Sequence, residues 1–340
     1  MFLLRSARRS DLAAVRALAN HLDSPNLPKD EAFLEARLLR SERSFALAGP
    51  PSAEAEYQFV LVDGTDEVVG TCAILSKHGT PDMPHVFLRV CQEHREAASL
   101  KIRVAHLTLQ LGSTEDGPTE IGALVLRPDV RGKPGWPGRL LSWGRFAYIA
   151  CHPASFERFL LAEMRASLTP DGKNRFWEAF GHRFTGLSYA EADRRSTIDK
   201  SFILDLFPST PFYASLLDPA VAEELGKVHP EARPALRLLE RAGFHWIGEI
   251  DPFDAGPFYG ADQSEVVPIR ELWRGAVALH EPAADARPGM IIAEEQGEFR
   301  ALAARAETRD GELLLSKEAR DRLELQVGDD VGLAPLPISS

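Results

Sequence analysis

The stretch that decides the fold is Ala-Leu-Val-Leu-Arg-Pro-Asp-Val-Arg-Gly-Lys-Pro-Gly-Trp-Pro-Gly-Arg-Leu-Leu, residues 123–141. Its apolar start predicts a strand, and a Gly-rich turn flanked by arginines then leads into an amphipathic helix over 138–150. Backbone N–H groups of such a turn, continued into the unpaired N-terminus of a helix, form a pyrophosphate site. The same pattern also describes ordinary strand-to-helix connections, and Pro134 and Pro137 each remove a donor.

A second stretch, Arg-Pro-Ala-Leu-Arg-Leu-Leu-Glu-Arg-Ala-Gly-Phe at residues 233–244, predicts a helix that ends at a glycine and leads into another strand. The order of strand, anion-binding turn and later helix ending in Gly-Phe is similar to that of GNAT-type N-acyltransferases. Both halves of such a site must reach one coenzyme. We therefore expect the strand ending at Leu126 and the strand after Phe244 to lie in one sheet.

The bulk composition limits the classes of partner. With 340 residues, 44% hydrophobic and 26% charged, the chain has the composition of a globular protein. Its formal net charge of -11 argues against nucleic acid or an anionic membrane as the main partner and suits a cationic small substrate. Cys72, Cys91 and Cys151 are too few and too widely spaced for a disulfide framework or a zinc site. With no membrane span or signal peptide in the sequence, we expect a cytoplasmic protein.

The predicted fold class is α+β, with a mixed, mostly antiparallel sheet flanked by helices, a helical insert and a small β-rich C-terminal unit. We expect a GNAT-like acyltransferase domain over residues 1–280, interrupted by the insert at about 151–228, and the C-terminal unit over 289–340. The first domain should contain strands at 2–5, 57–62, 68–75, 106–111 and 121–126. Helices are expected at 30–42, 155–166, 176–184, 189–195, 200–206 and 221–225.

Several short runs share their order and spacing with one enzyme family. They are Arg8–Leu12, Ser41–Phe45, Leu161–Arg165, Phe176–Ala179, Val228–Pro230, Arg233–Ala235 and Phe253–Pro257. Through them the chain resembles the arginine N-succinyltransferases of arginine catabolism over nearly its whole length. The resemblance implies transfer of a succinyl group from succinyl-CoA to the α-amine of arginine, or of ornithine in two-subunit versions. Succinyl-CoA would be a co-substrate and no cofactor would be permanently bound. The partners would be these small molecules, with a homo- or hetero-oligomer containing a paralogous subunit also possible.

The resemblance also implies roles for two residues. Leu124 would sit where the family binds succinyl-CoA, and His229 would be the proton donor. GNAT enzymes in general use a tyrosine on the second helix to protonate the departing thiolate, but the matching stretch here, residues 238–241, has none. A histidine has a suitable pKa for this role. The alternative is that His229 simply starts a helix before Pro230.

The remaining candidate residues follow from the chemistry of the two substrates. The residues expected at the coenzyme are Leu124, Leu126, Arg131, Gly132, Gly135, Gly138 and Arg139. Strand N–H groups near Leu124 would stabilise the tetrahedral oxyanion. Glu120 and Asp254 are candidates for holding a guanidinium, or are ordinary surface carboxylates. The histidines at 94, 106, 182 and 245 lack metal-ligand spacing, so no metal site is predicted.

Two segments depart from the family pattern, namely the loop at 112–117 and the stretch 84–99. Both are expected near the acceptor, so the identity of the amine and of the acyl group stays open. Extra prolines in the phosphate turn also leave open a companion subunit that keeps the fold without turnover.

Overall fold

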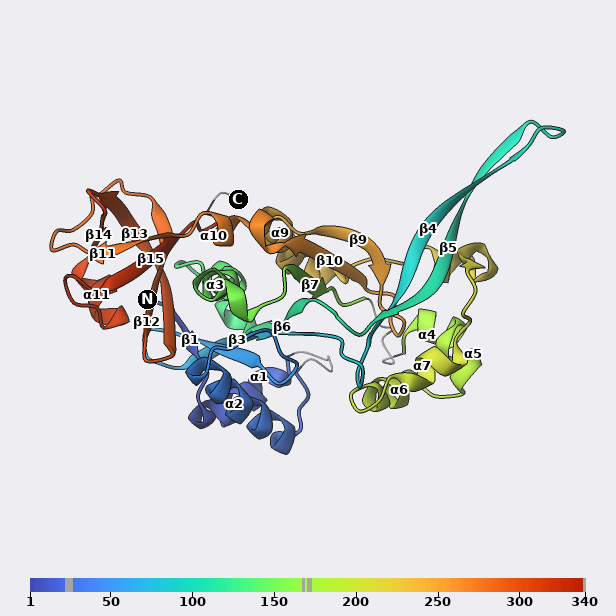
Figure 1. The fold of residues 1–340 in the computed structure, drawn as a ribbon, viewed down its shortest axis with the longest axis horizontal. Helices are drawn as coiled ribbons and strands as arrows, with labels where there is room; N and C mark the ends of the chain where they lie inside the picture. Colours follow the sequence, from blue (N-terminus) through green and yellow to red (C-terminus); the bar gives the residue numbers. More distant parts are fainter. Residues whose placement is uncertain (22–26, 167–168, 170–172, 339–340) are drawn as a thin grey trace.

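The computed structural model describes residues 1–21, 27–166, 169 and 173–338. Among these residues, fifteen strands form one continuous mixed sheet in the order β12-β15-β11-β14-β13-β1-β2-β3-β6-β7-β10-β9-β4-β5-β8. Figure 1 shows the C-terminal unit at one end of the molecule and a two-stranded arm at the other. Mixed pairing, flanking helices and a β-rich C-terminal unit confirm the predicted fold class.

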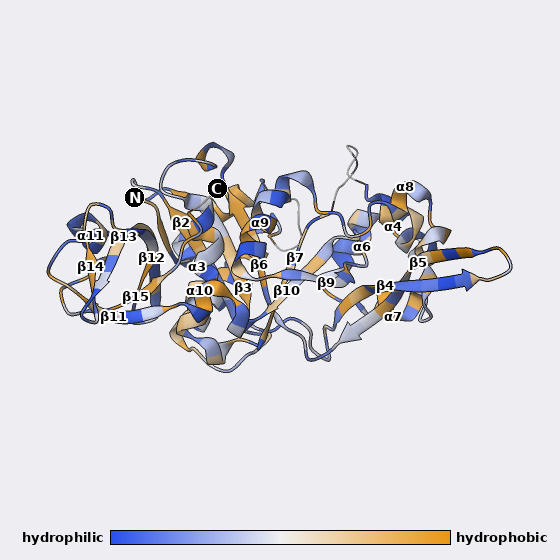
Figure 2. Ribbon diagram, turned by 90° about the horizontal axis from the view of Figure 1, so that it is seen from above, coloured by the Kyte–Doolittle hydropathy of each residue, from blue (hydrophilic) through white to orange (hydrophobic). Residues whose placement is uncertain are grey.

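The central part of the sheet is antiparallel and covered on both faces. It contains β1 (Leu3–Ser6), β2 (Glu56–Val62), β3 (Val68–Leu75) and β6 (Thr119–Leu126). Along β2, Phe59 and Leu61 pack toward α3 (Pro137–Cys151), whereas Val60 and Val62 pack with α1 (Leu12–Ala19) and α2 (Glu31–Ala46). This alternation is the period of two expected of a strand between two helical layers. Figure 2 shows hydrophobic residues concentrated along these central strands.

One predicted helix is wrong. Residues 155–166 form a short 3-10 turn and then strand β7 (Phe159–Glu163), which pairs parallel to β6 and antiparallel to β10 (Pro257–Asp262). Leu160, Leu161 and Ala162 are all buried. A short run that is apolar on every side has no periodicity to distinguish a strand from a helix. The helical insert therefore begins only after β7.

The insert is built from short helices. They are α4 (Arg175–Ala179), α5 (Gly181–Thr185), α6 (Tyr189–Ser196), α7 (Ser201–Leu206) and α8 (Pro219–Ala222). The single helix predicted for 176–184 is broken at Phe180, whose φ/ψ of -125°/-76° is not helical. Phe180 packs its ring on Phe176, Phe207 and Phe212. The helix is thus interrupted at the residue whose ring packs in this aromatic cluster.

The second motif folds as expected. Helix α9 (Arg233–Ala242) ends at Gly243, whose φ of +114° suits a glycine, and strand β9 (His245–Ile250) follows. Strands β6 and β9 belong to the same sheet, which confirms the predicted union of the two motif halves. The short helix α10 (Val267–Arg270) leads out of this domain. In the part of the chain that the structure describes, 3-10 turns lie at residues 9–11, 128–130, 153–155, 214–216, 230–232 and 263–265.

Strands β4 (His85–Ala97) and β5 (Ile102–Thr114) form an arm that projects from the body (Figure 1). They pair from His85↔Thr114 to Ala97↔Ile102, and β8 (Phe212–Tyr213) pairs with β5. The sequence predicted only residues 106–111 as a strand here. Most residues of β4 beyond residue 88 are polar and most are exposed, and Figure 2 shows the strand largely hydrophilic. A strand with no buried face has no alternating pattern to reveal it.

The C-terminal unit contains β11 (Trp273–Val277), β12 (Pro288–Glu295), β13 (Glu298–Arg309), β14 (Glu312–Leu315), α11 (Lys317–Leu323) and β15 (Asp330–Ala334). Strand β11 lies before residue 289, where the C-terminal unit was expected to begin, but it pairs with β14 and β15 and so joins this unit. Strand β13 pairs with β1 through Leu4↔Ala301, which continues the sheet between the two parts. None of the described helices combines the length and apolar composition that a membrane span requires.

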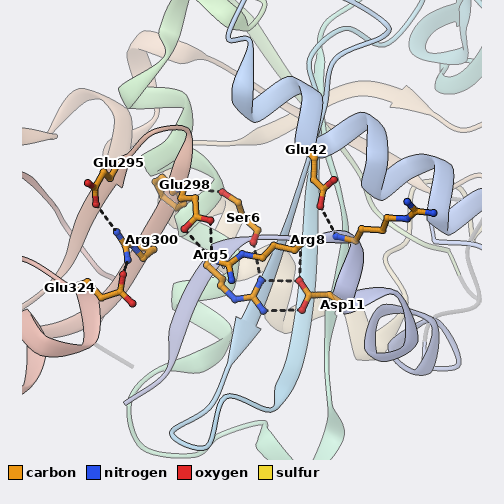
Figure 3. A network of polar contacts seen from close by, with 11 residues as sticks. Arg5, Ser6, Arg8, Asp11, Glu42, Glu295, Glu298, Arg300 and Glu324 are labelled. Carbon is orange, nitrogen blue, oxygen red and sulfur yellow. Dashed lines mark hydrogen bonds and ion pairs between the residues drawn. The ribbon is translucent and has the colours of Figure 1, made fainter.

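Polar contacts reinforce the junction between the two parts (Figure 3). The Arg5 guanidinium donates to both carboxylate oxygens of Asp11 at 2.8 Å, and Arg8 donates to Glu298 of β13 at 2.9 and 3.0 Å. Arg300, on β13, bonds Glu324 and Glu295. Of these contacts, Arg8–Glu298 crosses the junction and adds to the β1–β13 ladder, whereas the others lie within one part. None of the described residues of the C-terminal unit lines the central cavity described below.

Candidate functional site

The site begins where two parallel strands separate. Strands β6 and β7 pair only at Thr119↔Leu160 and Glu120↔Leu161. Beyond this point a cavity of about 440 Å³ opens between them, lined without interruption by residues 120–126 and 162–165. The edge of β6 that faces β7 therefore has backbone N–H and C=O groups without a strand partner. Such an edge can bind an extended chain that carries amide groups of its own.

A β-bulge lies at the centre of this edge. On β3, Thr71 faces Val125 of β6, but Ala73 faces Gly122, so three steps on β6 match two on β3. Ala123, inside the bulge, has a φ of +50°. A bulge bends its strand and re-aims the backbone groups around it. The N–H groups near Leu124 are thereby released from the regular ladder.

The Gly-rich turn follows directly and leads into α3. Gly132, Gly135 and Trp136 all have positive φ, at 75°, 93° and 54°. The Arg131 side chain lines the cavity and donates through Nε to the Leu126 carbonyl at 3.2 Å. In the first turn of α3, Nη1 of Arg139 is buried without a hydrogen-bond partner among the described residues. A buried guanidinium nitrogen with an unused proton fits an anion at this helix start.

The predicted coenzyme residues fall into two groups. Leu124, Leu126 and Arg131 line the cavity. The other four, Gly132, Gly135, Gly138 and Arg139, lie in the adjoining turn and first turn of α3, outside the cavity lining.

At the opposite end of the cavity three carboxylates converge. Oxygens of Glu163, Asp251 and Asp254 all lie within 4.8 Å of one another. Asp254 accepts from the N–H groups of Ala166 and Gly256, and Asp251 accepts from those of Phe253 and Asp254. These bonds fix two of the carboxylates, while Glu163 extends from the end of β7. The sequence indicated Asp254 but neither Glu163 nor Asp251. Glu163 lies in a segment that was predicted to be a helix.

The three carboxylates disfavour one another's charge. Burial and then the charge of Asp251 raise the pKa of Asp254 to about 7, against the backbone N–H bonds that favour its ionised form. Burial, with Asp251 and Asp254 next, raises the pKa of Glu163 well above its ordinary value. Burial also raises the pKa of Asp251. A cation entering the cluster would relieve this repulsion, so the cluster favours a cationic ligand.

Glu120, the other predicted substrate residue, also lines the cavity but has a different environment. Its buried carboxylate lies 2.9 Å from Nδ1 of His78. Burial alone would raise its pKa, but the charge and hydrogen bond of His78, with Lys200, outweigh burial and lower it to about 2. Burial and the charges of His78 and Lys200 lower the pKa of neighbouring His85 to about 3. Glu120 is therefore ionised and already paired.

His229 lies beside the cavity and is not one of its lining residues. It caps the 3-10 turn before α9, where Nδ1 accepts from Nη2 of Arg165 at 3.1 Å and from the Glu231 N–H at 3.2 Å. Burial and the Arg165 charge lower the pKa of His229. With two donors directed at Nδ1, the neutral ring carries its proton on Nε2. Arg165 and Glu231 do line the cavity and connect the histidine to it.

Comparison with known proteins gives one consistent result. The family described as arginine N-succinyltransferase beta subunit matches residues 2–268, and the family of its C-terminal domain matches residues 274–335. Arginine N-succinyltransferases of Escherichia coli (strain 55989 / EAEC) and Enterobacter sp. (strain 638) are 35% and 34% identical to the chain, covering 99% of it and 98% of each relative. The solved arginine/ornithine succinyltransferase subunit AI of Pseudomonas aeruginosa is 30% identical, with a TM-score of 0.83 and 98% of both chains covered.

Proposed function

Because the chain belongs to the arginine N-succinyltransferase beta subunit family, we propose that it transfers the succinyl group of succinyl-CoA to the α-amine of arginine or ornithine. The observation that carries the proposal is one continuous cavity with two chemically different ends. A bulged strand edge and a Gly-rich turn form one end, and a cluster of carboxylates forms the other. An acyl-CoA and a cationic amine are the pair of ligands that these ends match.

The donor occupies the first end. Its pyrophosphate lies at the start of α3, where Arg131 and Arg139 supply positive charge. Its pantetheine amides pair with the free edge of β6, and the thioester carbonyl accepts from an N–H group near Leu124. That N–H group stabilises the oxyanion that forms when the amine attacks.

The acceptor occupies the second end. Its cationic side chain lies among Glu163, Asp251 and Asp254. Their pKa values are raised, so a cation would stabilise the ionised carboxylates. A guanidinium has five N–H donors and can bind a carboxylate through two parallel hydrogen bonds. It therefore suits the cluster better than a spherical cation does. Glu120 adds a fixed negative charge at the same end.

The reaction needs proton transfers at both the nitrogen and the sulfur. The α-ammonium first loses a proton to water, and its neutral nitrogen then bonds to the thioester carbon. As the C–S bond breaks, the nitrogen gives up a second proton and the departing coenzyme A thiolate takes one up, so the amide and the thiol are both neutral. His229 supplies the proton to sulfur through Nε2, because Nδ1 is engaged by Arg165 and the Glu231 N–H. The products are the N-succinyl amino acid and free coenzyme A thiol.

The setting of the enzyme is also proposed. We place it in the cytoplasm, where its free cysteines 72, 91 and 151 would stay reduced. The P. aeruginosa relative is named as a subunit of an arginine/ornithine enzyme. By analogy, this chain works as an oligomer with copies of itself or with a paralogous subunit.

Two measurements on the purified chain test the proposal against that of a companion subunit without turnover. Calorimetric titration with coenzyme A reports binding, and thiol release from succinyl-CoA reports transfer. We expect binding in the first, and in the second thiol release that depends on arginine or ornithine. Binding without any amine-dependent thiol release would support the companion subunit and contradict the proposal.

A further inference from the structure

Arg145 is a buried cation in an unusual setting. It lies on the third turn of α3, and the whole residue is only 2% exposed. Its guanidinium donates to the Ser142 carbonyl at 3.1 Å, to the Gly122 carbonyl at 3.4 Å and to Ser142 Oγ at 3.5 Å. All of these acceptors are neutral.

No Asp or Glu in the described part of the chain forms an ion pair with Arg145 or raises its pKa. Burial lowers the pKa of the Arg145 guanidinium, and the charge of an ionised Cys72 opposes this shift. A charged side chain taken out of water without an opposite charge is costly. Three hydrogen bonds also leave two of the five guanidinium protons unused. Both observations indicate that the partner of Arg145 comes from outside the chain.

Arg145 is also one of the residues that line the cavity, at the first end described above. Its contact with Gly122 places it beside the bulge of β6, two residues before Leu124. Two residues along a strand span about 7 Å at most. In a succinyl thioester, three C–C bonds of about 1.5 Å separate the carboxylate carbon from the thioester carbon. With a hydrogen bond of about 3 Å, an extended succinyl chain covers the same distance.

We propose that Arg145 binds the terminal carboxylate of the acyl donor and thereby selects a succinyl thioester over a neutral acyl thioester. This assignment rests on the proposed function of the cavity. A guanidinium recognises any carboxylate, including the α-carboxylate of the amino acid. Its contact with the Gly122 carbonyl, beside the bulge where the thioester is proposed to bind, favours the donor, and the charges of Glu163, Asp251 and Asp254 do not shift its pKa.

The test compares Arg145→Gln with wild type on two pairs of substrates. The donor pair is succinyl-CoA and butyryl-CoA, which have acyl chains of the same carbon number with and without the carboxylate. The acceptor pair is arginine and agmatine, which lacks the α-carboxylate. Arg158→Gln is the matched control, because Arg158 is exposed and pairs with Asp262, and neither residue lines the cavity.

We expect Arg145→Gln to lower the preference for succinyl-CoA over butyryl-CoA, measured as the ratio of kcat/KM values, by about 10- to 100-fold, the size of one charge-assisted hydrogen bond. The preference for arginine over agmatine should not change. Loss of the arginine preference instead, or an equal loss with both donors, would overturn the assignment.

Direct binding provides a readout that does not need turnover. Calorimetric titration should show that wild type binds succinyl-CoA more tightly than butyryl-CoA and that Arg145→Gln binds the two alike. If wild type itself binds both equally, the assignment is wrong even if the chain is an active succinyltransferase. A wild type that prefers succinyl-CoA in binding but transfers it to no amine would contradict the proposed function and leave the assignment of Arg145 supported.

Discussion

Replacing Glu163 with glutamine tests the acceptor end of the cavity most sharply. The substitution keeps the size of the side chain but removes its charge. Loss of a hydrogen bond to a charged group costs about 1.5–3 kcal/mol, or one to two decades in binding. We therefore expect Glu163→Gln to lower kcat/KM for arginine by about 10- to 100-fold at alkaline pH and to leave the KM for succinyl-CoA unchanged.

The effect should depend on pH in a defined direction. Because the pKa of Glu163 is raised, the wild-type side chain is neutral below that pKa and resembles glutamine. The difference between wild type and variant should therefore be small at low pH and grow as the pH rises through the raised pKa. The assay is the initial rate of thiol release at saturating succinyl-CoA with arginine varied, across about pH 5 to 9.

Stability should change in the opposite sense to activity. A carboxyl group whose folded-state pKa is raised contributes stability at low pH and loses it as the pH rises through the folded-state pKa. Glu163→Gln removes this loss, so above that pKa the variant should resist urea at least as well as wild type. Glu178→Gln, at an exposed position of α4, is the matched control. An equal activity loss at every pH, or no loss with arginine, would refute the reasoning.

Four further outcomes are expected. Arg131→Ala and Arg139→Ala should each weaken coenzyme A binding by about one to two decades in calorimetry, with the circular dichroism spectrum unchanged; unaltered affinity in both would place the phosphates elsewhere. His229→Ala should lower kcat about 10²–10⁴-fold with little change in KM, and a normal kcat in the folded variant would make the histidine structural. Arginine binding near pH 7 should release protons, seen in calorimetry as a dependence on the buffer's ionisation enthalpy, because a cation lowers the raised pKa of Asp254 to below about 7. Gly243→Ala should cost more than about 1 kcal/mol in urea unfolding, since its φ is +114° and a Cβ would lie 2.9 Å from the Glu265 carbonyl; an unchanged midpoint would contradict this.

The strand, the Gly-rich turn and the helix at the proposed donor end could be predicted from the sequence because each is encoded by local signals. A strand, a Gly-rich turn and a helix that follow one another keep their neighbours whatever the rest of the chain does. Leu124, Leu126 and Arg131 accordingly line the cavity. Gly243, which follows the last residue of α9, could also be predicted, because a left-handed residue at a helix end is usually glycine.

The acceptor half could not be predicted in the same way. Glu163, Asp251 and Asp254 meet because β7 pairs with β10 in the sheet, a contact between residues about a hundred positions apart. The apolar run that forms β7 carries no periodicity that distinguishes a strand from a helix, so its pattern does not place Glu163 at a strand end beside Asp251 and Asp254. Arg145 was missed for another reason. An arginine in an amphipathic helix is ordinarily exposed, and only the structure shows this one to be buried without a carboxylate.

The most direct test of the central claim is to incubate the purified chain with succinyl-CoA and arginine and to analyse the products by mass spectrometry while free thiol is titrated. The account predicts α-N-succinylarginine and coenzyme A thiol in equal amounts, with neither formed at a comparable rate when arginine or the protein is omitted. Coenzyme A binding without any succinylated arginine or ornithine would contradict it.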